Sequence, residues 1–272
     1  MKKKIAITGG EGFLGRYVYE QLIKHNYSVL LLDKKKHSLF NQKSLKTFLK
    51  DIDVIIHLAA KNRDTDVNIF QTNAVGTLML IEAAKEFCPS ARIILASSFQ
   101  VYNAVNMYSF SKKAAEELLN LQIKGSDLKG TILRIANIYG PGCRPFYNSV
   151  IATFIHLIKD GKRVLVNGNG SQKRDYIYVG DVASAILAVV KYQQKKAIEE
   201  FDICTGKLFS LNQVLKLLQK AIQKKVKIVY DKSFIPKEKT INKSFNYAQQ
   251  KLGWSPKVSL INGLEMSINE KD

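Results

Sequence analysis

The stretch ITGGEGFLG near the N-terminus constrains the fold of this chain most strongly. The apolar run at residues 4–8 predicts a strand and residues 13–24 predict a helix, so a G-x-x-G-x-x-G pattern fills the turn between them. In such a turn Gly9 permits a tight bend and Gly12 lets the backbone approach a pyrophosphate, while Gly15 lets the helix pack closely on the strand. In this context the pattern predicts a dinucleotide-binding site.

An acid follows where a dinucleotide fold needs one. Asp33 ends the second apolar run, residues 27–33, where a carboxylate would hold the adenosine ribose hydroxyls of NAD and repel a 2′-phosphate. Lys34 and the two lysines after it would instead accept the 2′-phosphate of NADP, or simply form a solvated loop. The sequence therefore leaves the choice between NADH and NADPH open.

Strand-length apolar runs and helical segments alternate over the first 140 residues. Further strands are expected at 53–60, 91–97 and 131–136, and helices at about 67–87 and 108–121. Strands that are apolar on both faces and separated by helices form parallel sheets, and right-handed crossovers give a doubly wound Rossmann fold.

Past residue 140 the regular alternation of strands and helices ends. The segment GPGCRP, whose glycines and prolines interrupt helices and strands, is followed by shorter elements. We expect a dinucleotide-binding Rossmann domain made of residues 1–142 plus about 176–210. A small, discontinuous α/β substrate part would comprise about 143–175 and 211–272.

The amino-acid composition argues against several classes of protein. The three cysteines lie far apart and the histidines are not clustered, so neither a disulfide framework nor a metal site is expected. No signal peptide or membrane span is visible, which predicts a cytoplasmic protein that is not bound to a membrane. The net charge is +19, yet the lysines are spread along the chain, mostly on polar helix sides (Lys24, Lys85, Lys112, Lys113, Lys216 and Lys220). A solvated surface explains this charge better than a nucleic-acid partner does.

A Tyr-x-x-x-Lys pattern occurs three times, and only its surroundings distinguish one copy. Ser98 ends the fourth predicted strand, at the carboxyl edge where ligands bind in this architecture, and Tyr108 and Lys112 begin the next helix one turn apart. A nearby cation favours the ionised form of a tyrosine, so this trio suits proton and hydride transfer at a carbinol or ketone. The copies that begin at Tyr192 and Tyr247 are interpreted as surface coincidences.

Here the sequence resembles the extended short-chain dehydrogenase/reductases, the NAD-dependent epimerase/dehydratase family that acts on nucleotide sugars. The resemblance covers nearly the whole chain. It rests on TGGEGFLG (8–15), HLAA (57–60), QTNAVGT (71–77), SSFQVY (97–102), YSFSK (108–112), LRIANIYGPG (133–142), RDYIYVGDVA (174–183) and LGWSP (252–256).

The resemblance implies roles for particular residues. Ser98, Tyr108 and Lys112 would form the catalytic trio, and Ser98, Asn137 and Arg174 would contact a UDP-sugar substrate. The cofactor would lie along Tyr108, Lys112 and a set of further residues: Gly9, Gly12, Phe13, Leu14, Gly15, Asp33, Lys34, Leu58, Ala59, Ala60 and Asn73. Asp181 would pin the loop before a helix.

Alternatives to these roles stay open. Asn73 and Asp181 are also suited to capping a helix or a turn, and Arg174 to an interdomain ion pair. The C-terminal part departs from the family, because Asn242 and Lys243 stand where relatives often carry an acid. A homodimer through the helices that start near residues 67 and 108 is a further expectation from the resemblance.

Two differences from other members of the family, and one further resemblance, narrow the reactions that this chain is expected to catalyse. Phe99 and Gln100 occupy the places where the 4,6-dehydratases carry an Asp-Glu pair, so dehydration is not expected. Only nine residues separate Ser98 from Tyr108, fewer than epimerases usually have. CRPFYNSVIATF (143–154) and NMYSFSK (106–112) resemble segments of reductases that act on UDP-linked 4-keto-6-deoxy-N-acetylhexosamines.

The leading hypothesis is therefore an NAD(P)H-dependent reductase acting at C4 of such a sugar. From UDP-4-keto-6-deoxy-GlcNAc it would give UDP-N-acetylquinovosamine or its C4 epimer. The alternative is an NAD-dependent nucleotide-sugar 4-epimerase. A non-catalytic dinucleotide-sensing protein is a remote third possibility, since such proteins typically lose the Tyr/Lys pair.

Overall fold

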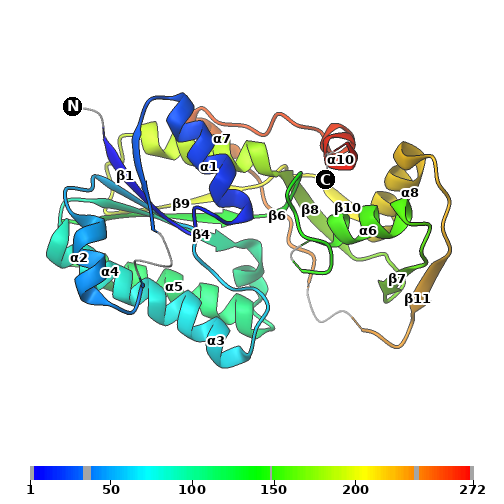
Figure 1. Cartoon of the computed structure of the whole chain (residues 1–272), viewed down its shortest axis with the longest axis horizontal. Coiled ribbons are helices and arrows are strands. Elements are labelled where there is room, and N and C mark those ends of the chain that lie inside the picture. Colours follow the sequence, from blue (N-terminus) through cyan, green and yellow to red (C-terminus); the bar gives the residue numbers. More distant parts are fainter. Residues whose placement is uncertain (1–2, 33–37, 148, 236–238, 270–272) are drawn as a thin grey trace.

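The computed structural model describes residues 3–32, 38–147, 149–235 and 239–269, and shows a larger α/β body beside a smaller one (Figure 1). In the described chain the central sheet has six strands, all parallel, in the order β2-β1-β3-β4-β5-β9. The strands are β1 (Lys4–Thr8), β2 (Ser28–Leu31), β3 (Val54–His57), β4 (Arg92–Ser98), β5 (Lys129–Ile135) and β9 (Ile198–Ile203). The predicted α/β doubly wound parallel sheet is confirmed.

Helices cover both faces of this sheet, as its alternating apolar residues require (Figure 1). Ile5 and Ile7 of β1 pack in one core with α1 and α7, whereas Ala6 between them packs in a second core with α2, α4 and α5. These helices are α1 (Phe13–Lys24), α7 (Val179–Lys191), α2 (Gln42–Leu49), α4 (Gly76–Phe87) and α5 (Met107–Ile123).

The order of the strands places the ligand-binding edge. β1 pairs with β2 on one side and with β3 on the other, so the chain changes winding direction at β1. In open α/β sheets ligands bind at such a switch point, outside the carboxyl ends of the strands. The loops after β1, β3 and β4 all open onto this edge.

The start of α5 is fixed by its cap. The Asn106 side chain accepts a hydrogen bond from the Ser109 backbone N–H at 2.9 Å, and the Ser109 hydroxyl contacts the Asn106 backbone N–H at 3.2 Å. This reciprocal capping box begins the helix at Met107. Tyr108 and Lys112 therefore lie in its first two turns.

The smaller body carries two further sheets around its own core. A three-stranded sheet has the order β10-β8-β6 and a two-stranded sheet pairs β11 with β7. The buried side chains of Tyr139, Phe154 and Leu215 belong to this core. The elements are β6 (Asn137–Tyr139), β7 (Val164–Asn167), β8 (Lys173–Tyr178), β10 (Leu208–Ser210), β11 (Ile228–Asp231), α6 (Val150–Lys159), α8 (Leu211–Ile222) and α10 (Leu260–Ile268). The division into two domains at the expected boundaries stays a prediction.

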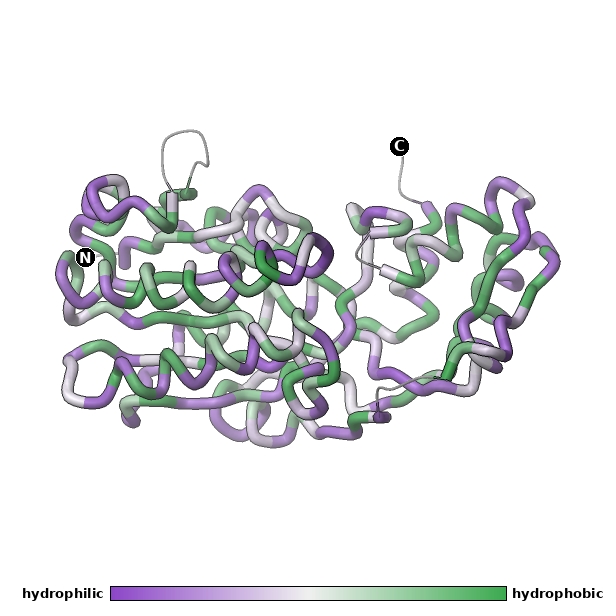
Figure 2. The backbone as a smooth tube through the Cα atoms, turned by 90° about the horizontal axis from the view of Figure 1, so that it is seen from below, coloured by the Kyte–Doolittle hydropathy of each residue, from purple (hydrophilic) through white to green (hydrophobic). Residues whose placement is uncertain are grey.

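The C-terminal segment returns to the larger body. Helix α9 (Asn246–Leu252) packs on β9 and α7, and the Trp254 indole N–H donates to the Ser184 hydroxyl at 2.9 Å. Along the backbone tube, hydrophilic and hydrophobic residues alternate on the outer helices (Figure 2). In the part of the chain that is described, no helix is long and apolar enough to cross a membrane.

One expected helix is interrupted. Residues 67–87 form α3 (Asp66–Phe70), a π-helical turn η1 (Gln71–Val75) and then α4. A π-helical turn inserts an extra residue into the helical repeat, which hydrophobic periodicity does not reveal. The turn contains Asn73, one of the expected site residues.

Candidate active site

The glycine loop after β1 is shaped by contacts that a side chain would break. Gly9 has a φ of +72°, and a Cβ added to it would lie 2.7 Å from the backbone nitrogen of Ala59. A Cβ on Gly15 would lie 2.6 Å from the carbonyl oxygen of Gly10. Gly12 caps α1 and offers no side-chain hydrogen bond to the first N–H groups of this helix, which begins at Phe13. This arrangement fits a pyrophosphate.

We expect Gly9→Ala to weaken NADH binding by more than about tenfold, because the new methyl group must push apart the loops after β1 and β3. Fluorescence titration with NADH measures the effect. Gly125→Ala is the matched control, since Gly125 has a φ of +76° but nothing within 4 Å of an added Cβ. Equal NADH affinity in the two variants would contradict the assigned role of Gly9.

The loop after β3 is held in place against the glycine loop. The backbone N–H groups of Leu58 and Ala59 donate to the carbonyl and hydroxyl oxygens of Thr8, at 3.1 and 3.3 Å. Ala60 follows at the same edge. The positions expected to line the cofactor thus lie directly beside Gly9, and their contact with a cofactor stays a prediction.

Asn73 holds this loop from the other side. Its amide oxygen accepts from the Lys61 N–H and its amide nitrogen donates to the Lys61 carbonyl, both at 2.8 Å. The same nitrogen donates to the Ser111 hydroxyl at 2.9 Å, and Ser111 in turn donates to the Tyr108 carbonyl at 2.8 Å. Asn73 is fully buried and caps no helix. Its side chain connects the cofactor edge to the helix of Tyr108.

A buried histidine extends this network, and the sequence analysis did not single it out. His57 contacts the hydroxyls of Thr8 at 2.6 Å and Thr77 at 2.9 Å. Thr77 donates its own proton to the Asn73 carbonyl, so it accepts from His57 Nε2, and Thr8 donates to Nδ1. Burial, and then the charge of Lys112, lower the pKa of His57 to about 3. The ring is therefore neutral and structural at physiological pH.

Ser98 and Tyr108 meet at the carboxyl end of β4. Their side chains are hydrogen-bonded to each other, and the Gln100 backbone N–H donates to the Ser98 hydroxyl at 3.2 Å. Burial raises the pKa of Tyr108, and the bond from Ser98 lowers it in part. Tyr108 is consequently protonated at neutral pH and can donate that proton.

Lys112 lies one turn further along α5 and is buried, with 3% of its surface exposed. The prediction that placed this lysine with others on polar helix sides was wrong, because this face of α5 packs on the sheet. Burial lowers the pKa of Lys112 to about 8, and the charge of Glu116 opposes the shift. At neutral pH its ammonium is charged, and the residue lies one turn along α5 from Tyr108.

The other two Tyr-x-x-x-Lys copies lie away from this edge. The hydroxyls of Tyr192 and Tyr247 both donate to the carboxylate of Glu199, at 3.2 and 2.9 Å. Their tyrosines thus share a structural carboxylate on β9 and stand apart from Ser98.

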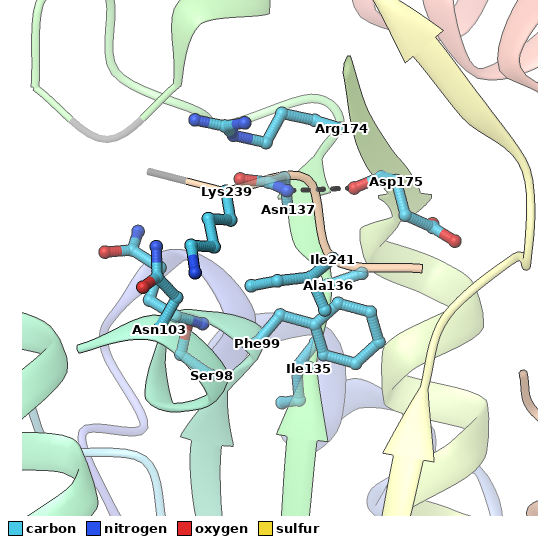
Figure 3. Close-up of a pocket in the computed structure, with 11 residues that line it drawn as sticks. Ser98, Phe99, Asn103, Ile135, Ala136, Asn137, Arg174, Asp175, Lys239 and Ile241 are labelled. Carbon is cyan, nitrogen blue, oxygen red and sulfur yellow. Dashed lines mark hydrogen bonds between the residues drawn. The ribbon is translucent and has the colours of Figure 1, made fainter. Parts of the chain in front are cut away.

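A pocket opens above Ser98, between the two bodies (Figure 3). Arg174 and Lys239 enter it from the side opposite to Ser98. Its lining comprises Ser98, Phe99, Gln100, Asn103, Ile135, Ala136, Asn137, Arg174, Asp175, Lys239 and Ile241. The pocket thus brings together Ser98, Asn137 and Arg174, the three residues expected to contact substrate, and Tyr108 and Lys112 are not part of its lining.

Three polar residues of the lining, Asn137, Arg174 and Asp175, already make hydrogen bonds within the protein. The Asn137 amide donates to the Asp175 carbonyl at 3.0 Å, and the Asp175 carboxylate accepts from the N–H groups of Thr205 and Gly206 at 3.1 and 2.7 Å. Arg174 donates to the Lys173 carbonyl at 3.1 Å. A second, apolar hollow lies next to the first and also includes Arg174 in its lining, with Val150, Phe154, Leu165, Leu211 and Phe234.

Three more residues were assigned roles from the sequence: Asp181, Asp33 and Lys34. Asp181 accepts from the N–H groups of Lys257 and Val258 at 3.1 and 2.9 Å, which anchors the loop before α10. Asp33 and Lys34 lie outside the described residues. In the described ranges, no group of His, Cys, Asp and Glu side chains is arranged to hold a metal ion.

A parallel sheet with a glycine loop at its first strand and a Ser/Tyr/Lys trio at its carboxyl edge defines a dinucleotide-dependent oxidoreductase of the short-chain dehydrogenase/reductase type. The family model of the NAD dependent epimerase/dehydratase family matches residues 5–204. The chain belongs to this family and uses a nicotinamide cofactor.

Individual relatives agree with this membership. A putative UDP-glucose 4-epimerase from Methanocaldococcus jannaschii is 28% identical over 97% of both chains. The UDP-2-acetamido-2,6-beta-L-arabino-hexul-4-ose reductase of Pseudomonas aeruginosa is 30% identical over 75% of this chain and 55% of its own length. The crystal structure of UDP-glucose 4-epimerase from Thermotoga maritima with UDP-glucose superposes with a TM-score of 0.87, at 28% identity over 97% of both chains.

Proposed function

We propose that this protein is an NAD(P)H-dependent reductase that transfers hydride to C4 of a nucleotide-linked 4-keto-6-deoxy sugar. The sugar is UDP-4-keto-6-deoxy-GlcNAc and the product UDP-N-acetylquinovosamine or its C4 epimer. The observation that carries the proposal is the hydrogen bond between Tyr108 and Ser98, because Ser98 lines a pocket that also offers the amide side chains of Gln100, Asn103 and Asn137.

The trio divides the work of reduction. The Ser98 hydroxyl holds the C4 oxygen, and Tyr108 donates its proton to that oxygen as negative charge develops on it. The Lys112 ammonium would stabilise the tyrosinate that is left, and Lys112 would also help to hold the cofactor. When bound, the reduced nicotinamide supplies the hydride.

The two adjoining hollows fit the shape of a nucleotide sugar. The polar hollow over Ser98 takes the sugar and the apolar hollow takes the nucleoside, because Arg174 lines both and lies where a diphosphate would join them. Several relatives are named for UDP-sugars. UDP is therefore the proposed nucleotide.

Elimination of water is disfavoured by the same lining. Phe99 is buried in the core and Gln100 is an amide, so neither can act as an acid or base. Among the described lining residues the carboxylate is that of Asp175, and backbone N–H groups occupy it.

The short path from Ser98 to Tyr108 favours reduction over epimerisation. A 3₁₀ turn, η2 (Phe99–Asn103), and the cap of α5 fill it, leaving no loop there to cover the sugar. The relative from P. aeruginosa, named as a hexulose 4-reductase, agrees with this preference.

A 4-epimerase is the second candidate, favoured by the full-length similarity to proteins named as UDP-glucose 4-epimerases. Incubation of the purified protein with UDP-4-keto-6-deoxy-GlcNAc and NADPH or NADH separates the two. A reductase oxidises the cofactor in proportion to substrate consumed. No oxidation, together with interconversion by retained NAD⁺ of UDP-sugars that differ in the configuration of their C4 hydroxyl, in a separate incubation, would establish the epimerase instead.

We expect Arg174→Ala to raise the KM for the nucleotide sugar by about 10- to 100-fold, since a charge-assisted bond to phosphate contributes about 1.5–3 kcal/mol. Steady-state kinetics measure it. Arg163→Ala, which removes an exposed arginine outside both pockets, is the control and should leave KM unchanged. An unchanged KM in Arg174→Ala would remove Arg174 from the substrate site.

The exposed apolar side chains of the larger body suggest how two copies of the chain would associate. We propose a cytoplasmic homodimer formed through α4 and α5 and their surroundings, where Val67, Phe110 and Leu121 expose apolar side chains. Light scattering after gel filtration measures the mass, and a monomer at micromolar concentration would contradict it.

A further inference from the structure

A carboxylate that no sequence motif singled out lies beneath the proposed trio. Glu116 is one helical turn beyond Lys112 on α5, and its side chain is completely buried. Burying a carboxylate is costly unless charge and hydrogen bonds compensate, so its partners indicate its purpose.

Glu116 joins three elements of the site. The Ser97 hydroxyl donates to its Oε1 at 2.5 Å, and Ser97 directly precedes Ser98 on β4. From β5, Arg134 donates to both carboxylate oxygens, through Nε at 3.1 and 3.0 Å and through Nη2 at 2.7 Å. The carboxylate thus ties the strand end that carries Ser98 to the helix that carries Tyr108 and Lys112.

Glu116 also supplies the negative charge that acts on the buried ammonium, from one turn further along the same helix. Among the described residues around Lys112, His57 on β3 and Tyr108 on α5 are neutral at physiological pH, and Arg134 on β5 is cationic. Arg134 divides its charge between Glu116 and Glu200 of β9, the latter at 2.9 Å. Without Glu116 the ammonium would stand among neutral and cationic groups alone.

We propose that Glu116 is a positioning residue that keeps Lys112 charged and in place beside Tyr108. The inference rests on the proposed function only through the contact of Lys112 with the cofactor. Burial disfavours the charged ammonium and lowers the pKa of Lys112, and the charge of Glu116 opposes this shift by raising that pKa.

The affinity for NADH, measured by fluorescence from pH 6 to pH 10, tests the inference without requiring turnover. In the native protein, affinity should fall as Lys112 loses its proton near pH 8. Glu116→Gln keeps the size of the side chain and removes its charge. The pH at which the affinity for NADH falls should therefore be lower by about one unit in this variant. Glu116→Asp keeps the charge and should leave the fall near its native pH.

Two further variants separate charge from structure. Arg134→Gln removes the cation that partly neutralises Glu116, so the fall should move up in pH. Glu117→Gln makes the same charge change one residue later on α5, at an exposed position paired with Lys113, and should shift nothing. Opposite shifts in Glu116→Gln and Arg134→Gln cannot arise from loosened packing.

Several results would overturn the inference. One is a Glu116→Gln variant whose affinity drops equally at every pH; another is a shift of equal size in Glu117→Gln. If Glu116→Gln does not fold, an unshifted Arg134→Gln would overturn it as well. A native protein that shows the pH-dependent binding but oxidises neither NADH nor NADPH with the keto sugar would refute the proposed reductase and leave the role of Glu116 standing.

Discussion

Tyr108→Phe is expected to lower kcat for reduction of the keto sugar by about 10²- to 10⁴-fold, the usual contribution of a positioned general acid. Tyr108 carries the hydroxyl bonded to Ser98 at the edge of the sheet, and phenylalanine fills the same space without a proton to give. Affinity for NADH should stay near its native value, since the ring remains. Stopped-flow and steady-state measurements of NADH oxidation give the two quantities.

The chain offers its own control for this variant. Tyr247→Phe removes a hydroxyl from another Tyr-x-x-x-Lys copy, where it binds Glu199 on β9 away from the pocket. It should retain nearly full activity. Loss of activity in Tyr247→Phe, or its retention in Tyr108→Phe, would contradict the choice of the copy at residue 108.

Lys112→Met is expected to abolish reduction and at the same time to stabilise the fold. The ammonium of Lys112 is buried and its pKa is lowered to about 8, which corresponds to roughly 3 kcal/mol of lost stability at neutral pH. Methionine removes that cost, and Glu116 keeps its pairing with Arg134. Thermal unfolding at pH 7 should therefore show a higher Tm in the inactive variant.

The difference in stability between the native protein and Lys112→Met should change with pH in a definite direction. A lysine whose pKa is lower in the folded protein than in the unfolded chain binds fewer protons when folded between pH 8 and about 10.5. The native protein therefore gains stability relative to Lys112→Met as pH rises through that window, and the difference in Tm narrows. Lys113→Met, at an exposed neighbour, should change neither Tm nor activity. A Tm of Lys112→Met below the native value at pH 7 would contradict a buried, charged lysine.

Local patterns predicted the first part of the fold closely. The strand at 4–8 and the helix at 13–24 match β1 and α1 in both bounds, because apolar alternation and the glycine turn fix them within a few residues. The parallel sheet follows from the repeated strand–helix order. The positions of Gly9 and Gly15 were predictable for the same reason, since close backbone approach requires glycine wherever this turn forms.

The contacts around the trio join residues that are far apart in the sequence, so local sequence patterns do not predict them. Glu116 and Arg134 are on different elements and meet only once α5 packs across β5. The links from His57 to Thr77 and from Asn73 to Lys61 likewise depend on how the π-helical turn places its residues. The role of Lys112 was predicted but its burial was not, because the face that α5 buries is set by its capping box at Asn106 and by the sheet beneath it.

The transfer of deuterium from labelled cofactor tests the central claim most directly. The protein is incubated with UDP-4-keto-6-deoxy-GlcNAc and NADPH or NADH that carries deuterium at C4 of the nicotinamide, and the product is examined by NMR. With both hydrogens at C4 of the nicotinamide replaced by deuterium, a C4 reductase must place one deuterium at C4 of the product sugar for each cofactor oxidised. Absence of deuterium uptake and of cofactor oxidation, with interconversion of UDP-sugars that differ at their C4 hydroxyl in a parallel incubation, would contradict the account.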